Sequence, residues 1–519
     1  MTGPDGARWP RELGRVLAGA LCGAAFGLLL HLLLFEVGFA RQVARPRLSL
    51  AWDAVIAWLA VIGAIAWWRG RRMKAAIERH LVPADLGASG TAGFALAAGF
   101  GALAVLHYHV AAFLLDVPTD LPSFLLASRA MADGADFYDP AVLIRYVDPG
   151  ESHEWFSPYP FPFPYLYLPV FAVLLWPLAA LPLPTAYAAV LLVNATLWPI
   201  LIYLCLRLVD PPDRIRAPLL VFALLLFPSF FPTIFTLHHG SPSLLVAVLI
   251  VGALVLERSG RSRLAGALVA LAVLIKIVPV VLLVYLALRR RWRALLWAAV
   301  AAVALMAVSV AVAGVEPHVR WVTELAPSLA SGARTGSFFE PACHPENQTF
   351  TSLVCRLLGA GSPWARPVAS LLGALVLIVA SLVLWRRRRP AIDGREGALL
   401  AVTVLLVSTI TWFHHMTLML PPLLALAAEA CLREGWRRWV LAAVSLGIAF
   451  GAGFEFYLNP WTFVAPNPFT HTLRMQAMLA SFVALLVVIG SERRGPSDET
   501  VVHTPPDAEE GLRGQRVSR

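Results

Sequence analysis

The chain has 519 residues, of which 59% are hydrophobic and 14% are charged, and its mean hydropathy is +0.71. Soluble globular domains carry about 25% charged residues, so this composition excludes an ordinary soluble protein and indicates a membrane as the surrounding solvent. The net charge is +10. Because the arginines gather in short loops between apolar runs, we attribute this charge to the positive-inside pattern of membrane proteins, not to nucleic-acid binding.

Apolar stretches of helical length recur along the whole sequence and predict an all-α polytopic membrane protein. A membrane-spanning helix needs about 20 apolar residues, and about 12–14 stretches approach that length. They cover residues 16–35, 51–68, 93–115, 166–182, 185–207, 217–236, 242–257, 263–288, 294–314, 367–385, 397–412, 416–431, 437–454 and 475–490.

Three regions follow from this pattern. Residues 1–91 contain an N-terminal pair of spans, and residues 92–490 form the main membrane core. Residues 491–519 are charged and rich in Pro and Gly, which predicts a disordered cytoplasmic tail. The first apolar run follows several arginines and resembles a signal peptide, but its length and the lack of a clean small-residue cleavage site favour a retained helix.

Basic loops predict the orientation of the spans. Four clusters of Lys and Arg are expected on the cytoplasmic side, within 69–79, 289–293, 386–389 and 433–438. Three long polar segments are then expected outside, at 116–165, 315–366 and 455–474. The loop with Arg41, Arg45 and Arg47 is an exception to this rule.

Strict alternation fails in the middle of the chain. Cytoplasmic placement of both 210–216 and 257–263 requires that the run 263–288 break at Lys276-Ile-Val-Pro279. It also requires that one segment between 166 and 216 does not cross the membrane fully.

Lys276 is the most unusual residue, because apolar residues surround it on both sides. A Lys at bilayer depth costs about 2.5–3.5 kcal/mol, so such residues usually face a cavity or an ion partner. Pro279 predicts a helix break that lines this cavity. The alternative is a Lys that snorkels from a helix end to the interface.

Two histidine pairs, His238 with His239 and His414 with His415, lie between apolar runs. Imidazole and ammonium groups donate hydrogen bonds to phosphate oxygens, so the pairs and Lys276 together predict an anion site, with phosphate as the first candidate. The alternative for each histidine is a hydrogen-bonded structural residue. No His or Cys spacing typical of a metal site is present, so we expect no metal and no cofactor.

Asp120 directly follows the third predicted span, and a carboxylate at the membrane edge can act as a general base. The alternative is a solvated loop acid, because the segment 116–165 carries many carboxylates. The aromatic residues of 155–167 suit sugar rings or an interfacial aromatic belt. Cys343 and Cys355 share one polar loop and form a candidate disulfide, with two free thiols as the alternative.

Several short motifs occur in order and resemble those of a known family. They are Asp120-Leu-Pro-Ser-Phe124, Ala127-Ser-Arg129, Gly134-Ala-Asp-Phe-Tyr138, Tyr167-Leu168-Pro169, Ala265-Gly266 leading to Lys276 and Pro279, Asn347-Gln348-Thr349, and Ser408-Thr-Ile-Thr-Trp412-Phe-His414-His415. Over about residues 93–490 the chain resembles bacterial glycosyltransferase family 87, which includes polyprenyl-phosphate-mannose-dependent α-mannosyltransferases of the GT-C fold. It differs at Gly240-Ser241-Pro242-Ser243, where the family usually has Gly-Gln-x-Asn.

The resemblance implies a hexosyltransferase that moves a sugar, mannose or another hexose, from a polyprenyl-phosphate donor to a glycolipid or glycan acceptor. It implies a multi-pass protein of the bacterial cell membrane with its site on the extracytoplasmic face. Asp120 would be the general base of an inverting displacement, and Lys276, His414 and His415 would hold the donor phosphate. Further candidate substrate-binding residues are Arg129, Tyr138, Tyr167, His238, His239, Asn347, Gln348 and Trp412.

Two other functions fit the same composition. A transporter or lipid flippase would use Lys276 in its pathway, but such proteins usually show two related halves, and the sequence shows no internal repeat. A polysaccharide polymerase or ligase also combines many spans with large external loops and uses polyprenyl-linked donors.

Overall fold

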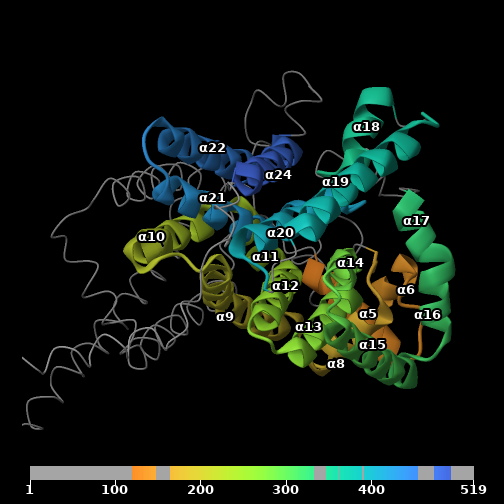
Figure 1. The fold of residues 1–519 in the computed structure, drawn as a ribbon. Coiled ribbons are helices and arrows are strands. Elements are labelled where there is room, and N and C mark those ends of the chain that lie inside the picture. The colour runs from red at the N-terminus through yellow and green to blue at the C-terminus, as the bar shows by residue number, and fades with distance from the viewer. Residues whose placement is uncertain are drawn as a thin grey trace, which may run out of the picture.

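The structure is a computed structural model that describes residues 120–147, 164–331, 347–359, 362–387, 391–453 and 473–491. Within these ranges the chain is helical and contains no strand (Figure 1). Five of the described helices are individually long and apolar enough to cross a membrane. The predicted class, an all-α polytopic membrane protein, is therefore confirmed. The predictions for the N-terminal pair of spans, the third span and the tail lie outside the described residues.

Helices of the membrane bundle match most of the predicted spans. In chain order they are α9 (Leu183–Val209), α10 (Asp213–Ser229), α11 (Phe231–His239), α12 (Ser243–Arg258), α13 (Ser262–Ile275), α14 (Val281–Leu288), α15 (Trp292–Ala313), α19 (Ala365–Arg387), α20 (Gly394–Val407), α21 (Leu420–Leu432), α22 (Trp436–Gly453) and α24 (Leu473–Ser491). The predicted span 217–236 is divided at Phe230 into α10 and α11.

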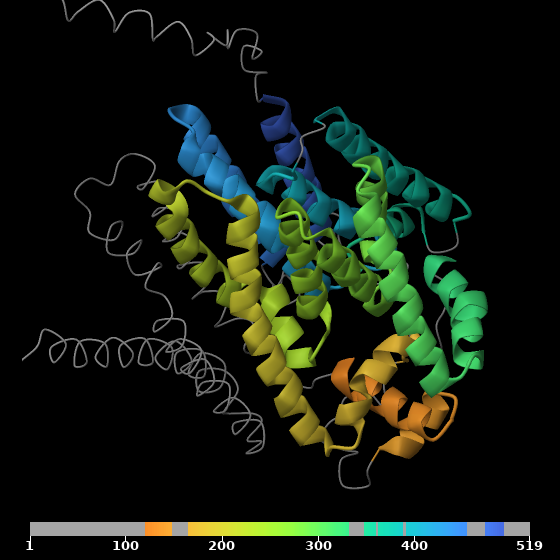
Figure 2. The ribbon, with the colours of Figure 1, turned by 60° about the horizontal axis from the view of Figure 1, so that its bottom comes forward.

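Shorter helices surround one end of this bundle. They are α5 (Asp120–Ala132), α6 (Pro140–Leu143), η2 (Ile144–Tyr146), α8 (Pro169–Ala179), η3 (Val278–Val280), α16 (Glu316–Arg320), the π-helical η4 (Trp321–Leu325), α17 (Ala326–Ser331), α18 (Phe350–Leu358) and η5 (Phe413–Met419). Figure 2 shows α5 and α8 at the end of the bundle where α9 begins and α15 ends.

The core of the bundle lies around η5 and α21. The apolar segment Phe413–Leu432 is 89% buried inside the protein, whereas only 11% of α15 is buried. Side chains at the centre therefore pack against other helices, and α15 presents most of its apolar surface outward.

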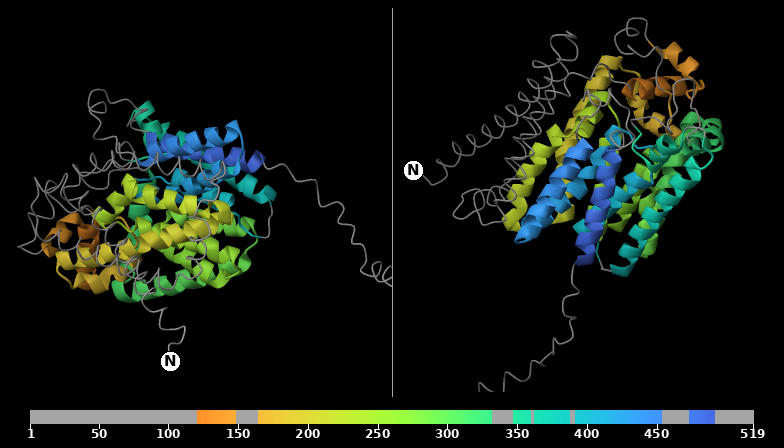
Figure 3. Two further views of the ribbon diagram at one scale, coloured as in Figure 1. Left: turned by 90° about the vertical axis from the view of Figure 1, so that its left-hand side faces the viewer. Right: turned by 90° about the horizontal axis from the view of Figure 1, so that it is seen from above.

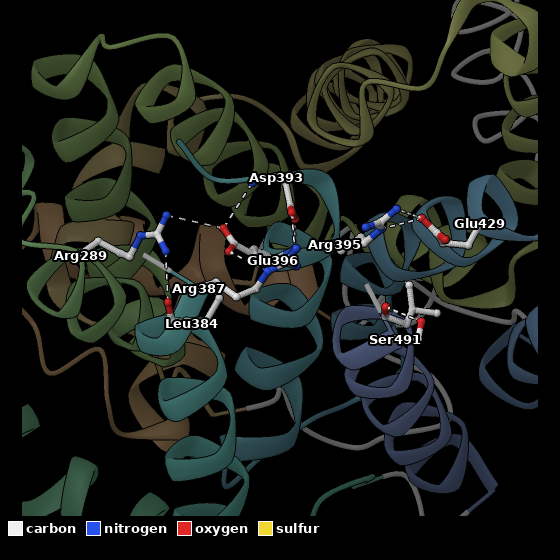
Figure 4. Close-up of polar contacts among 9 residues, drawn as sticks. Arg289, Leu384, Arg387, Asp393, Arg395, Glu396, Glu429 and Ser491 are labelled. Atoms are coloured by element: carbon white, nitrogen blue, oxygen red, sulfur yellow. Dashed lines mark hydrogen bonds and ion pairs between the residues drawn. The ribbon is translucent and has the colours of Figure 1, made fainter. Parts of the chain in front are cut away.

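Ion pairs connect the helix ends at the opposite end of the bundle from α5. Arg258, at the end of α12, pairs with Asp210 at 2.6 Å, and Glu257 pairs with Arg291 at 3.1 Å. Glu396 lies between Arg289 and Arg387, at 3.7 and 3.8 Å (Figure 4).

Glu429 completes this network, because it pairs with Arg395 (Figure 4) and also with Arg433 at 3.1 Å. We call the whole network the ion-pair belt. Glu257, Glu396 and Glu429 are buried, and burial of a carboxylate is tolerated only when a cation or hydrogen bonds compensate it. Arginines from three of the predicted basic clusters, around 289–293, 386–389 and 433–438, thus come together at one end of the molecule.

Three helices run from the belt to the end that carries Asp120. α12 has Arg258 in the belt and Ser243 at its other end, about 22 Å away at 1.5 Å per residue. α20 likewise begins at the belt, beside Glu396, and α21 ends there, beside Glu429. The views of Figure 3 show these bundle helices lying side by side.

The run 263–288 is broken where the sequence predicts. α13 ends at Ile275, Lys276 has extended backbone angles, and Pro279 lies in η3. A Cβ at Gly266 would overlap the carbonyl oxygen of Ala294, so the beginnings of α13 and α15 lie together. Because α14 leads directly into α15, the chain enters the bundle at the belt, turns at Lys276 and returns to the belt.

The prediction of a full span at 166–182 is wrong. Its helix, α8, has eleven residues and is about 16 Å long, whereas the hydrocarbon core is about 30 Å thick. α8 packs on α5, and the Arg129 guanidinium donates to the carbonyl of Ala179 at 2.9 Å. α8 is therefore the segment between 166 and 216 that does not reach the belt.

Candidate active site

Asp120 is the first residue of α5, and its carboxylate lies beside the η5 turn. Its Oδ2 atom is 3.9 Å from Nδ1 of His414, and its side chain is 20% exposed. Leu121 packs on Gly240, which has a positive φ of 65°. A Cβ at Gly240 would lie 2.7 Å from the Cβ of Leu121, so this close approach fixes the height of Asp120 above the bundle.

Lys276 projects into the same site from the turn between α13 and η3. Its Nζ atom donates a hydrogen bond of 2.8 Å to Oγ of Ser243, and it lies 5.7 Å from the ring centroid of Tyr167. The ammonium also interacts electrostatically with Asp120. Lys276 therefore faces an ion partner inside the protein, and the alternative of a Lys snorkelling to the interface does not fit.

Three of the four histidines in the two predicted pairs meet at this site. His414 and His415 lie on η5 with ring centroids 4.4 Å apart. His239, at the end of α11, stacks on Phe235 at 3.8 Å, and Phe235 also stacks on His414. His238 precedes His239 on α11, and its side chain is outside the described part of the structure.

The η5 turn orients the two imidazoles differently. The N–H of Trp412 donates to Nδ1 of His415 at 3.2 Å, which leaves Nε2 of His415 as the proton-bearing nitrogen of the neutral ring. His414 is 6% exposed, and its Nδ1 atom has no hydrogen-bond partner among the described residues. Both histidines interact electrostatically with Lys276. Such an array offers several hydrogen-bond donors to one anion.

Asn347 and Gln348 hold the segment that leads to Trp412. The N–H of Gln348 donates to the carbonyl of Thr411 at 2.8 Å, and Oδ1 of Asn347 accepts from the N–H of Thr411 at 3.0 Å. Nδ2 of Asn347 donates to the carbonyl of Thr409. Both residues are buried, so these contacts assign them a supporting position next to the histidines.

Arg129, Tyr138 and Tyr167 build the wall on the α5 side. The Arg129 guanidinium donates hydrogen bonds of 2.9–3.1 Å to the carbonyls of Ala179, Tyr146 and Leu181. The Tyr138 hydroxyl donates to the carbonyl of Tyr167 at 3.0 Å. Burial, with a smaller contribution from Asp120, raises the pKa of the Tyr167 phenol well above 10, so this ring is a neutral platform beneath Lys276.

Sequence reasoning missed the role of the Gly240–Ser243 turn. Ser241 and Ser243 lie with their hydroxyl oxygens 3.2 Å apart, both are buried, and Ser243 is the partner of Lys276. The available signal was a polar Gly-Ser-Pro-Ser segment between two apolar runs. Arg474 was also missed: it is 3% exposed and lies 3.8 Å over the ring of Phe413, the neighbour of His414.

Two further predictions concern cysteines and metals. Cys355 is disulfide-bonded, and its predicted partner Cys343 lies outside the described residues. In the described ranges, no group of three His, Cys, Asp or Glu side chains comes together as metal ligands. The site is instead composed of one carboxylate, one amine and imidazoles at the ends of α5, α11, η5 and α13.

A polytopic helical membrane protein with a carboxylate beside a buried cluster of amine and imidazole groups fits a membrane glycosyltransferase that uses a lipid-phosphate-linked sugar. Comparison with known proteins agrees with this class. The family model described as glycosyltransferase family 87 matches residues 165–411. This range includes Lys276, Asn347 and Gln348, and it lies within the range 93–490 over which the motifs resemble that family.

Two relatives extend the match. The chain is 30% identical over 340 residues to a polyprenol-phosphate-mannose-dependent alpha-(1-2)-phosphatidylinositol pentamannoside mannosyltransferase of Mycolicibacterium smegmatis, covering 62% of this chain and 75% of the relative. It is 27% identical over 352 residues to a polyprenol-phosphate-mannose-dependent alpha-(1-2)-phosphatidylinositol mannoside mannosyltransferase of Mycobacterium tuberculosis, covering 64% and 74%. No solved structure matches the chain.

The chain belongs to glycosyltransferase family 87. It is a multi-pass membrane glycosyltransferase, and this family membership excludes the alternative of a transporter or flippase.

Proposed function

We propose that the protein transfers mannose from polyprenyl-phosphate-mannose to a hydroxyl group of a glycolipid or glycan acceptor. The names of both relatives suggest the donor, and the phosphatidylinositol mannosides in those names suggest a lipid acceptor. The observation that carries the proposal is the position of Asp120, which faces His414 at 3.9 Å and interacts with Lys276. A carboxylate that could act as a base and groups that could bind a phosphate thus lie next to one another, which supports the proposal.

Asp120 acts as the general base in this proposal. Its carboxylate removes the proton of the acceptor hydroxyl, and the oxygen attacks the anomeric carbon of the donor sugar. The bond between that carbon and the phosphate oxygen breaks, and polyprenyl phosphate leaves from the opposite face. A single displacement of this kind inverts the anomeric configuration and requires no second carboxylate as a nucleophile.

Lys276, His414 and His415 hold the donor phosphate in this proposal. The phosphate gains negative charge as the sugar departs, and fixed donors in a buried site stabilise that charge more strongly than water does. The distance of 3.9 Å between Oδ2 of Asp120 and Nδ1 of His414 is longer than that of a hydrogen bond. Sites without substrate often show such loose contacts.

The ion-pair belt supports a sidedness for the reaction. Because arginine-rich loops remain in the cytoplasm, the belt lies at the cytoplasmic face of the bacterial cell membrane, and the site at the other end of α12 faces outward. A lipid-linked donor suits this location, since cytoplasmic nucleotide sugars do not reach the outer face.

The test uses purified protein in lipid nanodiscs, radiolabelled polyprenyl-phosphate sugars and a membrane glycolipid extract. We expect transfer from the mannose donor, a loss of about 10²–10⁴-fold in kcat for Asp120→Asn, and little change for Asp133→Asn, an exposed acid of the same segment. NMR of the product would show the inverted anomer. Normal transfer by Asp120→Asn, or retention of configuration, would contradict the proposed mechanism.

Lys276→Met tests the phosphate site separately. We expect loss of donor binding measured with a non-transferable donor analogue, whereas Asp120→Asn should bind that analogue normally. Equal analogue binding by wild type and Lys276→Met would remove Lys276 from the phosphate site while leaving the role of Asp120 intact.

A further inference from the structure

The helical segment 316–331, composed of α16, η4 and α17, leaves α15 at Gly314 and lies beside the site end of the bundle (Figure 1). We call it the outer arm. Gly314 has a φ of 80°, a conformation that favours glycine, and it ends α15 sharply. The outer arm therefore changes direction where the apolar span ends.

One face of the outer arm is bound to the protein. His318 is buried, with Nδ1 donating to the carbonyl of Gly314 at 2.7 Å and Nε2 accepting from the Ser309 hydroxyl at 2.9 Å. Trp321, one turn later, is also buried, and its indole N–H donates to the carbonyl of Leu166 at 3.2 Å. These contacts fix the rotation of the arm about its own axis.

A second face exposes a stripe of valines. Val315, Val319 and Val322 are 61%, 53% and 61% exposed. They are four and three residues apart, which is close to one helical turn each, so they lie on one side of the arm, next to the buried face. Polar and charged residues occupy the remaining face, where Glu316, Thr323 and Glu324 are exposed.

The valine stripe continues the outward surface of α15. Leu296, Val300, Val303, Val308 and Val312 are exposed along that helix, which is a candidate membrane span. Beyond Val312 the exposed valines follow at spacings of three or four residues, at Val315, Val319 and Val322. The exposed apolar residues of α15 are thus followed, beyond the turn at Gly314, by exposed valines on the arm.

We propose that the outer arm is an interfacial helix that lies on the outer leaflet of the membrane, with its valine stripe in the lipid and its acidic face in water. Three faces, one packed on protein, one apolar and one charged, are the arrangement required where protein, lipid and water meet. The partner of this surface is the lipid bilayer itself, because the stripe directly follows a candidate membrane span whose exposed side is also apolar.

The arm also connects the membrane surface to the site. Arg320 forms an ion pair with Asp136, and Trp321 binds Leu166, next to the Tyr167 platform. Seating of the arm in the leaflet therefore sets the height of Asp120 and Tyr167 above the lipid. This consequence rests on the proposed function: a membrane-embedded acceptor would meet the base at the right depth only when the arm is seated.

The direct test measures depth and needs no enzymatic activity. Val319→Cys and Val322→Cys are labelled with an environment-sensitive nitrobenzoxadiazole dye in nanodiscs, with Thr323→Cys as the matched control on the charged face. Wild type treated in the same way corrects for labelling of native cysteines. We expect lipids that carry a nitroxide near the headgroup to quench the two valine positions strongly, and aqueous iodide to quench only the control.

Two results would overturn the proposal. Quenching of Val319 and Val322 by iodide without quenching by lipid would place the stripe in water. Protection from both quenchers would show that another segment of the chain covers it.

An activity test then separates the arm from the chemistry. We expect Val319→Glu with Val322→Glu to lower transfer to a vesicle-embedded acceptor at least tenfold and to leave transfer to a short-chain, water-soluble acceptor nearly unchanged. Thr323→Glu serves as the control. Equal loss with both acceptors would assign the defect to the site or to folding, and unchanged transfer with both would remove the arm from substrate presentation.

Discussion

The ammonium nitrogen of Lys276 donates a hydrogen bond of 2.8 Å to the hydroxyl of Ser243, the first residue of α12. This bond joins the break between α13 and η3 to the Gly240–Ser243 turn, against which Leu121 of α5 packs. A hydrogen bond to a charged group contributes about 1.5–3 kcal/mol. Ser243 therefore positions the amine on which donor binding depends in our proposal.

Ser243→Ala should release the amine and raise the KM for the donor about tenfold, with a smaller change in kcat. Steady-state kinetics at varied donor concentration measures both constants. Ser259→Ala, at the other end of α12, removes an exposed hydroxyl bonded to the carbonyl of Val255 and should leave both constants unchanged. An unchanged KM for Ser243→Ala would show that Lys276 keeps its position without this partner.

Gly240→Ala should impair activity strongly, because it combines backbone strain with a steric clash. An L-residue in the left-handed region costs about 1–2 kcal/mol, and the new methyl group would lie 2.7 Å from the Cβ of Leu121. α5 must move, and Asp120 moves with it. Gly260→Ala isolates the strain, since Gly260 also has a positive φ but no atom lies within 4 Å of its Cβ position. Similar activities for the two variants would mean that the contact with Leu121 does not position Asp120.

Arg474→Met should lower both thermal stability and kcat. The guanidinium lies 3.8 Å over Phe413, next to His414, and a buried cation–π contact contributes about 2 kcal/mol. Arg474→Lys keeps the charge but loses the planar stack, so we expect an intermediate effect. Arg437→Met, which removes an exposed contact with Trp436 at 5.9 Å, is the control. A fall in melting temperature with normal kcat would limit Arg474 to a structural role.

Glu396→Gln should destabilise the fold without changing the chemistry of the folded enzyme. Glu396 is fully buried between Arg289 and Arg387 and caps the start of α20 with Asp393. Removal of one partner from a buried ion pair costs about 3–5 kcal/mol. Thermal unfolding in nanodiscs should show a large loss, whereas Asp213→Asn, in an exposed pair with Arg216, should show little. The kcat of Glu396→Gln is measured at a low temperature, where the variant remains folded. A fall in kcat under these conditions would show that the ion-pair belt affects the chemistry of the site.

The length and spacing of apolar runs were sufficient to predict the membrane class and most helices. So many long apolar runs are compatible only with a membrane, where a helix satisfies its own backbone polar groups and exposes its apolar side chains to lipid. The break at Lys276 was predictable for a related reason, because an unpaired ammonium is costly at that depth and Pro279 cannot continue a helix. The sequence also indicated Asp120, Lys276 and the His pairs as candidates, from the chemistry of their side chains.

The tertiary structure decided which segments cross and which side chains meet. α8 is as apolar as a true span, so its composition could not show that Arg129 holds it beside α5. The partnership of Lys276 with Ser243 and the approach of His414 to Asp120 join residues distant along the chain. Local periodicity carries no information about such contacts, because they arise only when the ends of separate helices are packed together.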